Sequence, residues 1–210
     1  MLIVGAKGFA KELLEVIIQE NPQAKIAFYD DVSKNLPELL FAKYPILKNE
    51  EAATSYLKGN DQCFALGIGN PRLRYQLYEK FVALGGNPTT VTSPFAHIGS
   101  FGTNIAQGCC ITMGVVITND VKIGIGCLLN LNSTVGHDSS LGDFCEISPG
   151  VHISGNVCVG NMCNLGTGAV ILPRVKLGNN VTVGAGAVVT KDVADNMTVV
   201  GVPAKPYQSS

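Results

Sequence analysis

An aliphatic residue recurs at every sixth position of this chain from residue 105 to residue 189. All fifteen positions of this register carry Ile, Leu or Val, and the residue four places further on is always small or β-branched. The residue directly after is Gly in seven of the repeats. No other feature restricts the possible folds as strongly. The register consists of Ile105, Ile111, Ile117, Ile123, Leu129, Val135, Leu141, Ile147, Ile153, Val159, Leu165, Ile171, Leu177, Val183 and Val189.

A six-residue period fits neither an α-helix nor a simple β-strand, but it fits a chain that turns a corner at every sixth residue. Three such sides close a triangular coil of eighteen residues, with one aliphatic side chain per side pointing inward. Fifteen repeats then make five coils, which stack to roughly 24 Å at about 4.8 Å per strand. We therefore predict an all-β prism of parallel strands, a parallel β-helix.

The cysteines support a coil of eighteen residues. Four of the seven are spaced by eighteen, so they should stack at one place on successive coils: Cys109, Cys127, Cys145 and Cys163. We interpret them as a column of small core side chains, because a straight column does not offer the converging ligands of a metal site. The odd number of cysteines lacks the spacing of a secreted disulfide framework and favours a reduced, cytoplasmic protein.

Residues 1–92 show a different pattern and should form a separate domain, with the prism and a C-terminal tail in residues 93–210. Short apolar runs at 2–4, 26–29 and 63–68 alternate with helical patterns at 10–19 and from Asn70 to Gly85. Strands that alternate with helices predict a small, Rossmann-like parallel sheet covered by helices. In the second helix we expect Leu73, Leu77, Phe81 and Leu84 to form the buried stripe.

All three predicted strands end in polar or Gly-rich segments, at the sheet edge where parallel sheets bind ligands. The first segment runs from Gly5 to Phe9 into a helix N-terminus, which can bind a phosphate but can equally be a plain strand-to-helix turn. Its Gly-x-x-Gly spacing does not indicate a dinucleotide. Asp30 could bind a ribose hydroxyl or lie solvated at the end of its strand.

Charge and hydropathy exclude several classes of protein. Fifteen basic and sixteen acidic residues give a net charge of -1, so no basic field exists to bind nucleic acid. No apolar run reaches the roughly 18 residues of a membrane-spanning helix. The apolar start of the chain is also too short for a signal peptide.

One of three histidines is a candidate base. His137 lies at a predicted corner directly before Asp138, and a carboxylate next to an imidazole can raise its basicity. From spacing alone, a solvated surface side chain is the favoured interpretation. His97 and His152 occupy other places in the coil, so a three-histidine metal site within one chain is disfavoured. A site shared between chains stays open, but we expect no metal.

Motifs along the whole chain resemble the hexapeptide-repeat bacterial sugar acetyltransferases, which include sialic acid O-acetyltransferases and nucleotide-amino-sugar N-acetyltransferases. The similarity rests on the opening Ile3–Glu12, the corner Val135–Asp138, the segment Gly142–Gly150 and the closing Val200–Lys205. It implies that the β-helix is left-handed. It also implies a homotrimer with active sites between subunits and acetyl-coenzyme A as co-substrate.

The resemblance also implies roles for particular residues. His137 is the general base that deprotonates a sugar amine or hydroxyl as it attacks the thioester, and Asp138 orients it. The family's coenzyme contacts fall on Glu146, Thr167 and Ala185. Its nucleotide-sugar contacts fall on Gly5, Lys7, Gly8, Phe9, Asp30, Asp31 and Gly69.

This chain departs from the family pattern at four of these positions. Asp138 replaces a Glu, and its shorter side chain predicts an indirect contact with the imidazole. Glu146 and Phe9 replace histidines, and Lys7 replaces a Ser; the lysine can still meet a phosphate as a cation. The alternative function is a non-catalytic trimer that binds a nucleotide-sugar or serves as a scaffold.

Overall fold

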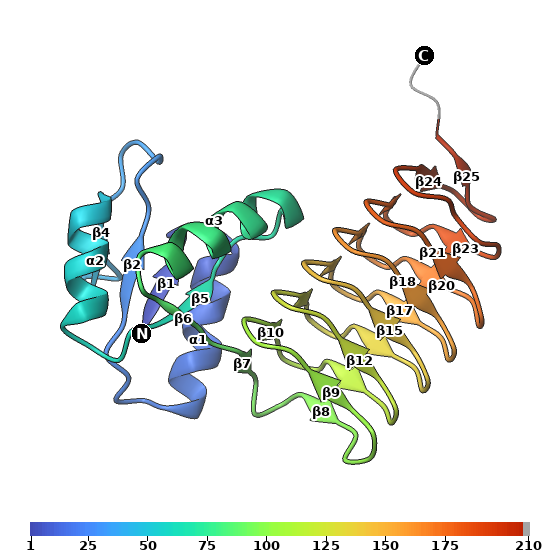
Figure 1. Cartoon of the computed structure of the whole chain (residues 1–210), viewed down its shortest axis with the longest axis horizontal. Coiled ribbons are helices and arrows are strands. Elements are labelled where there is room, and N and C mark those ends of the chain that lie inside the picture. The colour runs from blue at the N-terminus through green and yellow to red at the C-terminus, as the bar shows by residue number, and fades with distance from the viewer. Residues whose placement is uncertain (208–210) are drawn as a thin grey trace.

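The computed structural model describes residues 1–207, which form an α/β domain at one end of a long β-prism (Figure 1). The C-terminal end of the described chain lies at the far end of the prism, and the last three residues of the predicted tail lie outside the described residues. The division predicted at residue 92 stays a prediction. Strand pairing of the prism begins at β7 (Val91–Thr92), which pairs with β10 (Cys110–Ile111).

The N-terminal domain contains a six-stranded sheet in the order β3-β4-β2-β1-β5-β6. The pairs β1–β2, β1–β5, β2–β4 and β5–β6 are parallel and only β3–β4 is antiparallel. The sequence predicted the three central strands and missed the three outer ones. The strands are β1 (Leu2–Val4), β2 (Ala27–Tyr29), β3 (Leu39–Leu40), β4 (Tyr44–Leu47), β5 (Cys63–Leu66) and β6 (Asn87–Pro88).

Three helices pack on this sheet: α1 (Phe9–Glu20), α2 (Glu50–Lys58) and α3 (Pro71–Ala83). The α2 and α3 helices begin at asparagines whose side chains accept a backbone N–H, Asn49 from Ala52 and Asn70 from Leu73. Such caps satisfy amide groups that the first turn of a helix leaves without partners. The sequence predicted α1 and α3 but not α2.

The prism has three sheets, one on each of its faces, and all their strand pairs are parallel except one at the C-terminal end. We name each face after one of its strands. The β10 face holds β7, β10, β13 (Leu128–Leu129), β16 (Glu146–Ile147), β19 (Asn164–Leu165), β22 (Thr182–Val183), β24 (Thr198–Val200) and β25 (Lys205–Pro206). The β11 face holds β8 (His97–Ile98), β11 (Val116–Ile117), β14 (Thr134–Val135), β17 (His152–Ile153), β20 (Val170–Ile171) and β23 (Val188–Val189). The β12 face holds β9 (Asn104–Ile105), β12 (Lys122–Ile123), β15 (Ser140–Leu141), β18 (Cys158–Val159) and β21 (Lys176–Leu177).

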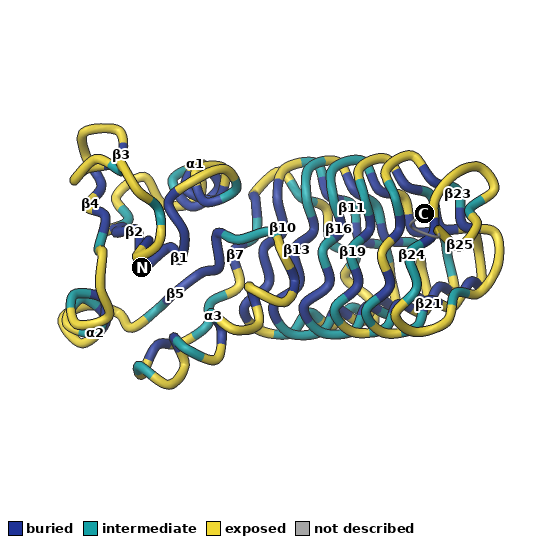
Figure 2. The backbone as a smooth tube through the Cα atoms, turned by 90° about the horizontal axis from the view of Figure 1, so that it is seen from above, coloured by how far each residue is buried: buried dark blue, intermediate teal, exposed yellow. Residues whose placement is uncertain are grey.

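The strand register confirms the eighteen-residue coil. Lys122 pairs with Ser140, and Ser140 with Cys158, at intervals of eighteen. The aliphatic residue of each repeat points into the core, and Figure 2 shows exposed residues gathered at the turns. The four stacked cysteines are buried in this core, and each Sγ lies 3.0–3.2 Å from a carbonyl oxygen of the same coil.

The N-terminal domain docks on the prism through α1 and α3. Cys110 and Leu128, which point outward from the β10 face, share a hydrophobic cluster with α1 residues such as Leu13. At the neighbouring corner, the Phe144 ring meets Tyr75 and Tyr78 of α3 edge-on, with ring centres 5.2 and 5.3 Å apart. Apolar contacts of both helices, together with hydrogen bonds from α3, therefore hold the two domains together.

The stripe predicted for α3 was wrong in part. Leu73 is 43% exposed, whereas Arg74, Tyr78 and Phe81 are buried. The helix is turned so that Arg74 faces the prism, where carbonyl oxygens satisfy its donors. Periodicity favoured the leucines because it weighs only hydropathy.

No helix in residues 1–207 is both long and apolar enough to cross a membrane. Within the same residues, no three His, Cys, Asp or Glu side chains lie close enough together to bind a metal ion.

Candidate active site

His137 and Asp138 form a hydrogen-bonded pair at the corner between the β11 and β12 faces. The turn that carries them joins β14 to β15, and it leaves the two side chains 66% and 55% exposed. The Nδ1 atom of His137 lies 2.6 Å from Oδ2 of Asp138. The prediction of an indirect contact was therefore wrong, because the left-handed backbone of Asp138 (φ 57°) holds its short side chain beside the ring.

A second contact fixes the imidazole on its other side. The ring lies against Gly155 in the next coil, where an added Cβ would be only 2.6 Å from Nε2 of His137. The backbone of the two coils is joined here, since the Asn156 N–H donates to the His137 carbonyl at 2.8 Å. With Nδ1 on Asp138, Nε2 is the nitrogen available for proton transfer. Sequence analysis singled out His137 but not Gly155. The only sequence feature of Gly155 is that it does not lie at the position where Gly recurs in the six-residue repeat.

A cavity of about 240 Å³ lies at the carboxyl ends of β1, β2 and β5. This is the edge of the sheet where parallel α/β folds bind ligands. Four of the residues predicted to bind substrate line it: Gly5, Lys7, Asp30 and Asp31. The α3 helix adds Leu73, which is exposed, and Leu77, which is half-buried against the domain core. The lining is mostly apolar with a few charged groups, as in many small-molecule sites.

The two aspartates of the cavity already have partners within the chain. Asp30 is only 9% exposed and accepts the Ser33 N–H at 2.8 Å, so it stabilises its own turn instead of lying solvated. Asp31 accepts a hydrogen bond from the Tyr29 hydroxyl at 2.6 Å and is paired with Lys80 at 3.3 Å. The Tyr29 hydrogen bond is the main reason that the pKa of Asp31 is lowered. Asp31 is therefore an anion at neutral pH.

The loop before α1 leaves the helix N-terminus open. Gly8 precedes the helix with φ 36° and ψ −113°, a conformation that few residues other than Gly adopt, and no side chain caps the first turn. Lys7 lies in the cavity next to this turn, whereas Phe9 is the first residue of the helix and lies outside the cavity lining. The N–H groups of Ala10 and Lys11 donate to the carbonyls of Lys7 and Gly8, so a phosphate here would be bound by the amides that precede them and by the Lys7 side chain.

Gly69 and Glu146 meet where the N-terminal domain touches the prism. A Cβ on Gly69 would lie 3.0 Å from Oε1 of Glu146, which points outward from β16 on the β10 face. Burial raises the pKa of Glu146, and the positive charge of Arg74 offsets this only in part. The structure thus places Glu146, a predicted coenzyme contact, beside Gly69, a predicted nucleotide-sugar contact.

Arg74 is the residue that joins these parts, and sequence analysis missed it. Its side chain is 1% exposed and donates hydrogen bonds to five backbone carbonyls, without a direct carboxylate partner. Two of these carbonyls belong to Ile68 and Gly69, and the other three to Gly126, Phe144 and Cys145 of the prism. It therefore ties the loop after β5 to the turn that leads to Glu146.

The other two predicted coenzyme contacts lie at a different corner from His137. Thr167 and Ala185 are exposed in successive turns between the β10 and β11 faces. The Gly186 N–H donates to the Thr167 carbonyl at 2.8 Å, and an added Cβ on Gly168 or Gly186 would touch nothing. These turns offer an open edge to a long ligand. Within one chain, however, they do not share a site with His137.

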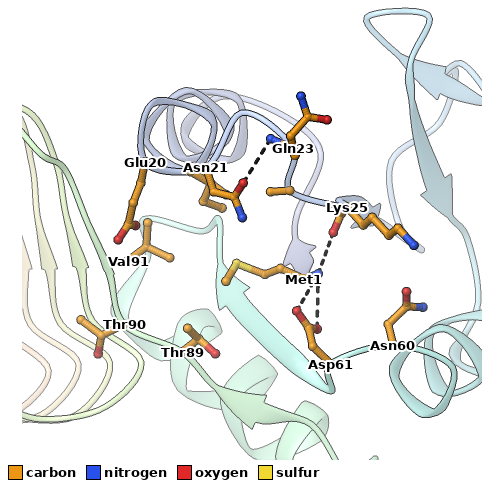
Figure 3. A pocket seen from close by; sticks show the side chains of 12 residues that line it. Met1, Glu20, Asn21, Gln23, Lys25, Asn60, Asp61, Thr89, Thr90 and Val91 are labelled. Atoms are coloured by element: carbon orange, nitrogen blue, oxygen red, sulfur yellow. Dashed lines mark hydrogen bonds and ion pairs between the residues drawn. The ribbon is translucent and has the colours of Figure 1, made fainter.

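A larger cavity, of about 780 Å³, lies at the opposite edge of the N-terminal sheet (Figure 3). It lies between the end of α1 and the segment Thr89–Val91, and its lining includes Lys25 and Asp61. None of the predicted site residues lines it. Size alone therefore does not identify the functional site.

Two family models match the chain in the expected order. Residues 1–81 match the PglD N-terminal domain, and residues 156–191 match the bacterial transferase hexapeptide repeats. No curated protein sequence matches the chain significantly.

Solved structures match almost the whole chain. The acetyltransferase domain of PglB from Neisseria gonorrhoeae is 32% identical with a TM-score of 0.88, and the match covers 98% of both chains. A variant of perosamine N-acetyltransferase from Caulobacter crescentus, in complex with CoA and GDP-perosamine, is 28% identical with a TM-score of 0.91, over 99% of this chain and 96% of that one. WeeI from Acinetobacter baumannii is 29% identical with a TM-score of 0.87, over 98% of both chains.

These matches extend over both domains, and they identify the prism as a left-handed parallel β-helix. The PglB domain has also been solved in complex with acetyl coenzyme A. An α/β domain of the PglD type, a hexapeptide prism and an identity above 30% over the full length agree with one another. The chain belongs to the hexapeptide-repeat family of bacterial sugar acetyltransferases.

Proposed function

We propose that this protein transfers the acetyl group of acetyl-coenzyme A to the amino group of a nucleotide-linked sugar. The observation that carries the proposal is the His137–Asp138 pair, held against Gly155 with Nε2 available for proton transfer. The acceptor class is supported by the cavity of the N-terminal domain and by the perosamine N-acetyltransferase complex with GDP-perosamine. The co-substrate is supported by the PglB complex with acetyl coenzyme A.

In this mechanism the acceptor amine attacks the thioester carbonyl directly. His137 Nε2 takes a proton from the attacking nitrogen, and Asp138 holds the ring and stabilises its positive charge. The Gly155 N–H, next to the ring, donates to the oxyanion of the tetrahedral intermediate. The carbon–sulfur bond then breaks, His137 returns the proton to the leaving thiolate, and an amide and free coenzyme A result. No cysteine is needed as a nucleophile.

The active sites lie between the subunits of a homotrimer in this proposal. One chain carries His137 at one corner and the open turns of Thr167 and Ala185 at another, so a second copy has to bring the two sets together. The β11 face fits an interface between copies because its outward positions include Val116, Val170 and Val188. Exposed Phe95 and Met113, at 62% and 50%, extend this surface at the adjacent corner.

The reaction is proposed to take place in the cytoplasm. All seven cysteines are free thiols in the described structure, which is the state that a reducing compartment maintains. Nucleotide sugars and acetyl-coenzyme A would reach the enzyme there as soluble substrates.

Thiol release from acetyl-coenzyme A, measured against a panel of nucleotide-linked amino sugars and free sialic acid, tests the proposal. Release with an amino sugar alone supports N-acetylation, whereas release with sialic acid alone would indicate O-acetylation. His137→Ala should lower kcat by about 10² or more while coenzyme binding persists. Wild-type turnover in that variant would refute the mechanism, and an absence of coenzyme binding by the wild type would favour the scaffold.

A further inference from the structure

The corner that carries His137 continues along the prism as a ridge of stacked turns. One residue in each turn has a left-handed backbone: Asp120, Asp138, Asn156 and Arg174, with φ of 57°, 57°, 60° and 65°. They are spaced by eighteen residues, and backbone hydrogen bonds join the turns, such as that from the Arg174 N–H to the Gly155 carbonyl at 3.2 Å. All four are exposed. We call these four residues the His137 ridge.

Arg174 is the exception in this ridge. Asp and Asn tolerate the left-handed region through local hydrogen bonds, whereas an arginine there is strained by roughly 1 kcal/mol or more. Phe144, at the corner between the β12 and β10 faces, has the same left-handed strain, but its ring contacts with Tyr75 and Tyr78 offset it. Among residues 1–207, the Arg174 side chain has no hydrogen bond or ion pair that could compensate. A strained and unpartnered residue suggests a ligand.

The charges on the ridge change sign along the prism. Asp120 and Asp138 lie at or before the coil of His137, Arg174 follows two coils later, and the next turn carries both Lys191 and Asp192, whose charges offset each other. An elongated ligand with one anionic end would therefore be aligned in one direction, with its anionic part at Arg174. Acetyl-coenzyme A has this form, because its thioester and its phosphates lie at opposite ends of the pantetheine arm.

The lengths agree with this orientation. Two coils place the Arg174 backbone roughly 10 Å beyond that of Asp138 at about 4.8 Å per strand. The pantetheine arm, with its two amide units, spans roughly 15 Å when extended. The side chain of an arginine covers most of the remaining distance, and its planar group can donate two parallel hydrogen bonds to one phosphate.

We propose that Arg174 is a specificity-determining residue of the coenzyme site, where its guanidinium binds a phosphate group of acetyl-coenzyme A. The inference rests on the proposed function and adds to it a residue outside the predicted contacts Glu146, Thr167 and Ala185. Arg174 would thereby distinguish acetyl-coenzyme A from acyl donors that lack the phosphates. It acts in binding and takes no part in proton transfer.

The test compares Arg174→Gly, Arg174→Lys and the wild type with two donors, acetyl-coenzyme A and acetyl-pantetheine, which has no phosphate. Arg174→Gly should raise KM for acetyl-coenzyme A about tenfold or more, which corresponds to one charge-assisted hydrogen bond, and leave kcat/KM for acetyl-pantetheine unchanged. Arg174→Lys keeps the charge and should retain most of the preference. In calorimetry, the Kd for free coenzyme A should weaken by a similar factor in Arg174→Gly.

Two controls separate this effect from misfolding and from a general loss of charge. Gly suits the left-handed region, so the unfolding temperature of Arg174→Gly should not fall. Lys58→Ala, on the exposed side of α2, removes one positive charge far from the ridge and should leave both donors unaffected. A wild-type Kd for coenzyme A in Arg174→Gly would overturn the inference. An absence of coenzyme binding by the wild type would instead overturn the proposed function.

Discussion

The contact between His137 and Gly155 gives a sharp test of the catalytic geometry. In Gly155→Ala, the new Cβ would lie 2.6 Å from His137 Nε2, whereas an ordinary contact needs about 3.4 Å, so the ring has to move by about 0.8 Å. The three nearest atoms to this Cβ all belong to the imidazole, which is 66% exposed and can move toward solvent. We expect the ring to leave its hydrogen bond with Asp138.

This displacement should affect catalysis much more than stability. A misplacement of about 1 Å in a reacting group can lower the rate about 10²-fold, so kcat of Gly155→Ala should fall by about that factor. No buried group is disturbed, so the free energy of unfolding should change by less than about 1 kcal/mol. Steady-state thiol release measures the first quantity, and denaturant unfolding measures the second.

A matched control comes from Gly59 at the end of α2, where an added Cβ would approach only one backbone oxygen within 3.4 Å, at 3.3 Å. Gly59→Ala should therefore leave kcat unchanged. If Gly155→Ala retains wild-type kcat, the position of the imidazole against Gly155 does not matter for the reaction, and the proposed orientation of His137 is wrong.

Three further substitutions test other parts of the site. Asp138→Asn suits the left-handed backbone but stabilises the charged imidazole less, so kcat should fall at least about tenfold without loss of thermal stability. Arg74→Met leaves buried carbonyls without donors, and denaturant unfolding should show a loss of about 3 kcal/mol or more. Burial raises the pKa of Glu146, so the protonated side chain is compatible with the fold and the stability it allows in acid is lost as the carboxylate ionises at higher pH. Glu146→Gln stays neutral and should therefore melt higher than wild type at pH 7. This difference should vanish below about pH 4, where Glu146 is protonated as well.

The prism could be predicted from the sequence because one rule applies at every coil. An inward aliphatic residue and a small corner residue are needed each time, so period and register can be counted directly. The same count also shows that the repeat His97–Gly99 lies one residue out of register, and Val116 pairs with His97 at an interval of nineteen, whereas Lys122 pairs with Asn104 at eighteen. The deviation at the C-terminal end could not be counted in this way, since Thr182 pairs with Thr198 at sixteen.

The site was less predictable because several of its residues act through the contacts of the folded chain. His137 and the strand-end loops have local signals, namely an adjacent acid and Gly-rich turns. Arg74 has none, since a helical pattern counts an arginine as exposed unless carbonyls from distant segments satisfy its donors. Gly155 is meaningful only because the His137 ring of the preceding coil lies on it.

Because each inner coil holds eighteen residues, one whole coil is the smallest step by which the prism can be lengthened or shortened. Along the prism, Arg174 lies two whole coils beyond Asp138, the partner of His137, and this distance changes only in steps of one coil when the core register is kept. Deletion of residues 156–173 would join Gly155 to Arg174. The arginine would then take the place of Asn156, one coil nearer to His137. The length of the acyl carrier that fits between His137 and Arg174 would therefore be set by the number of coils between these two residues, independently of the side chains on those coils.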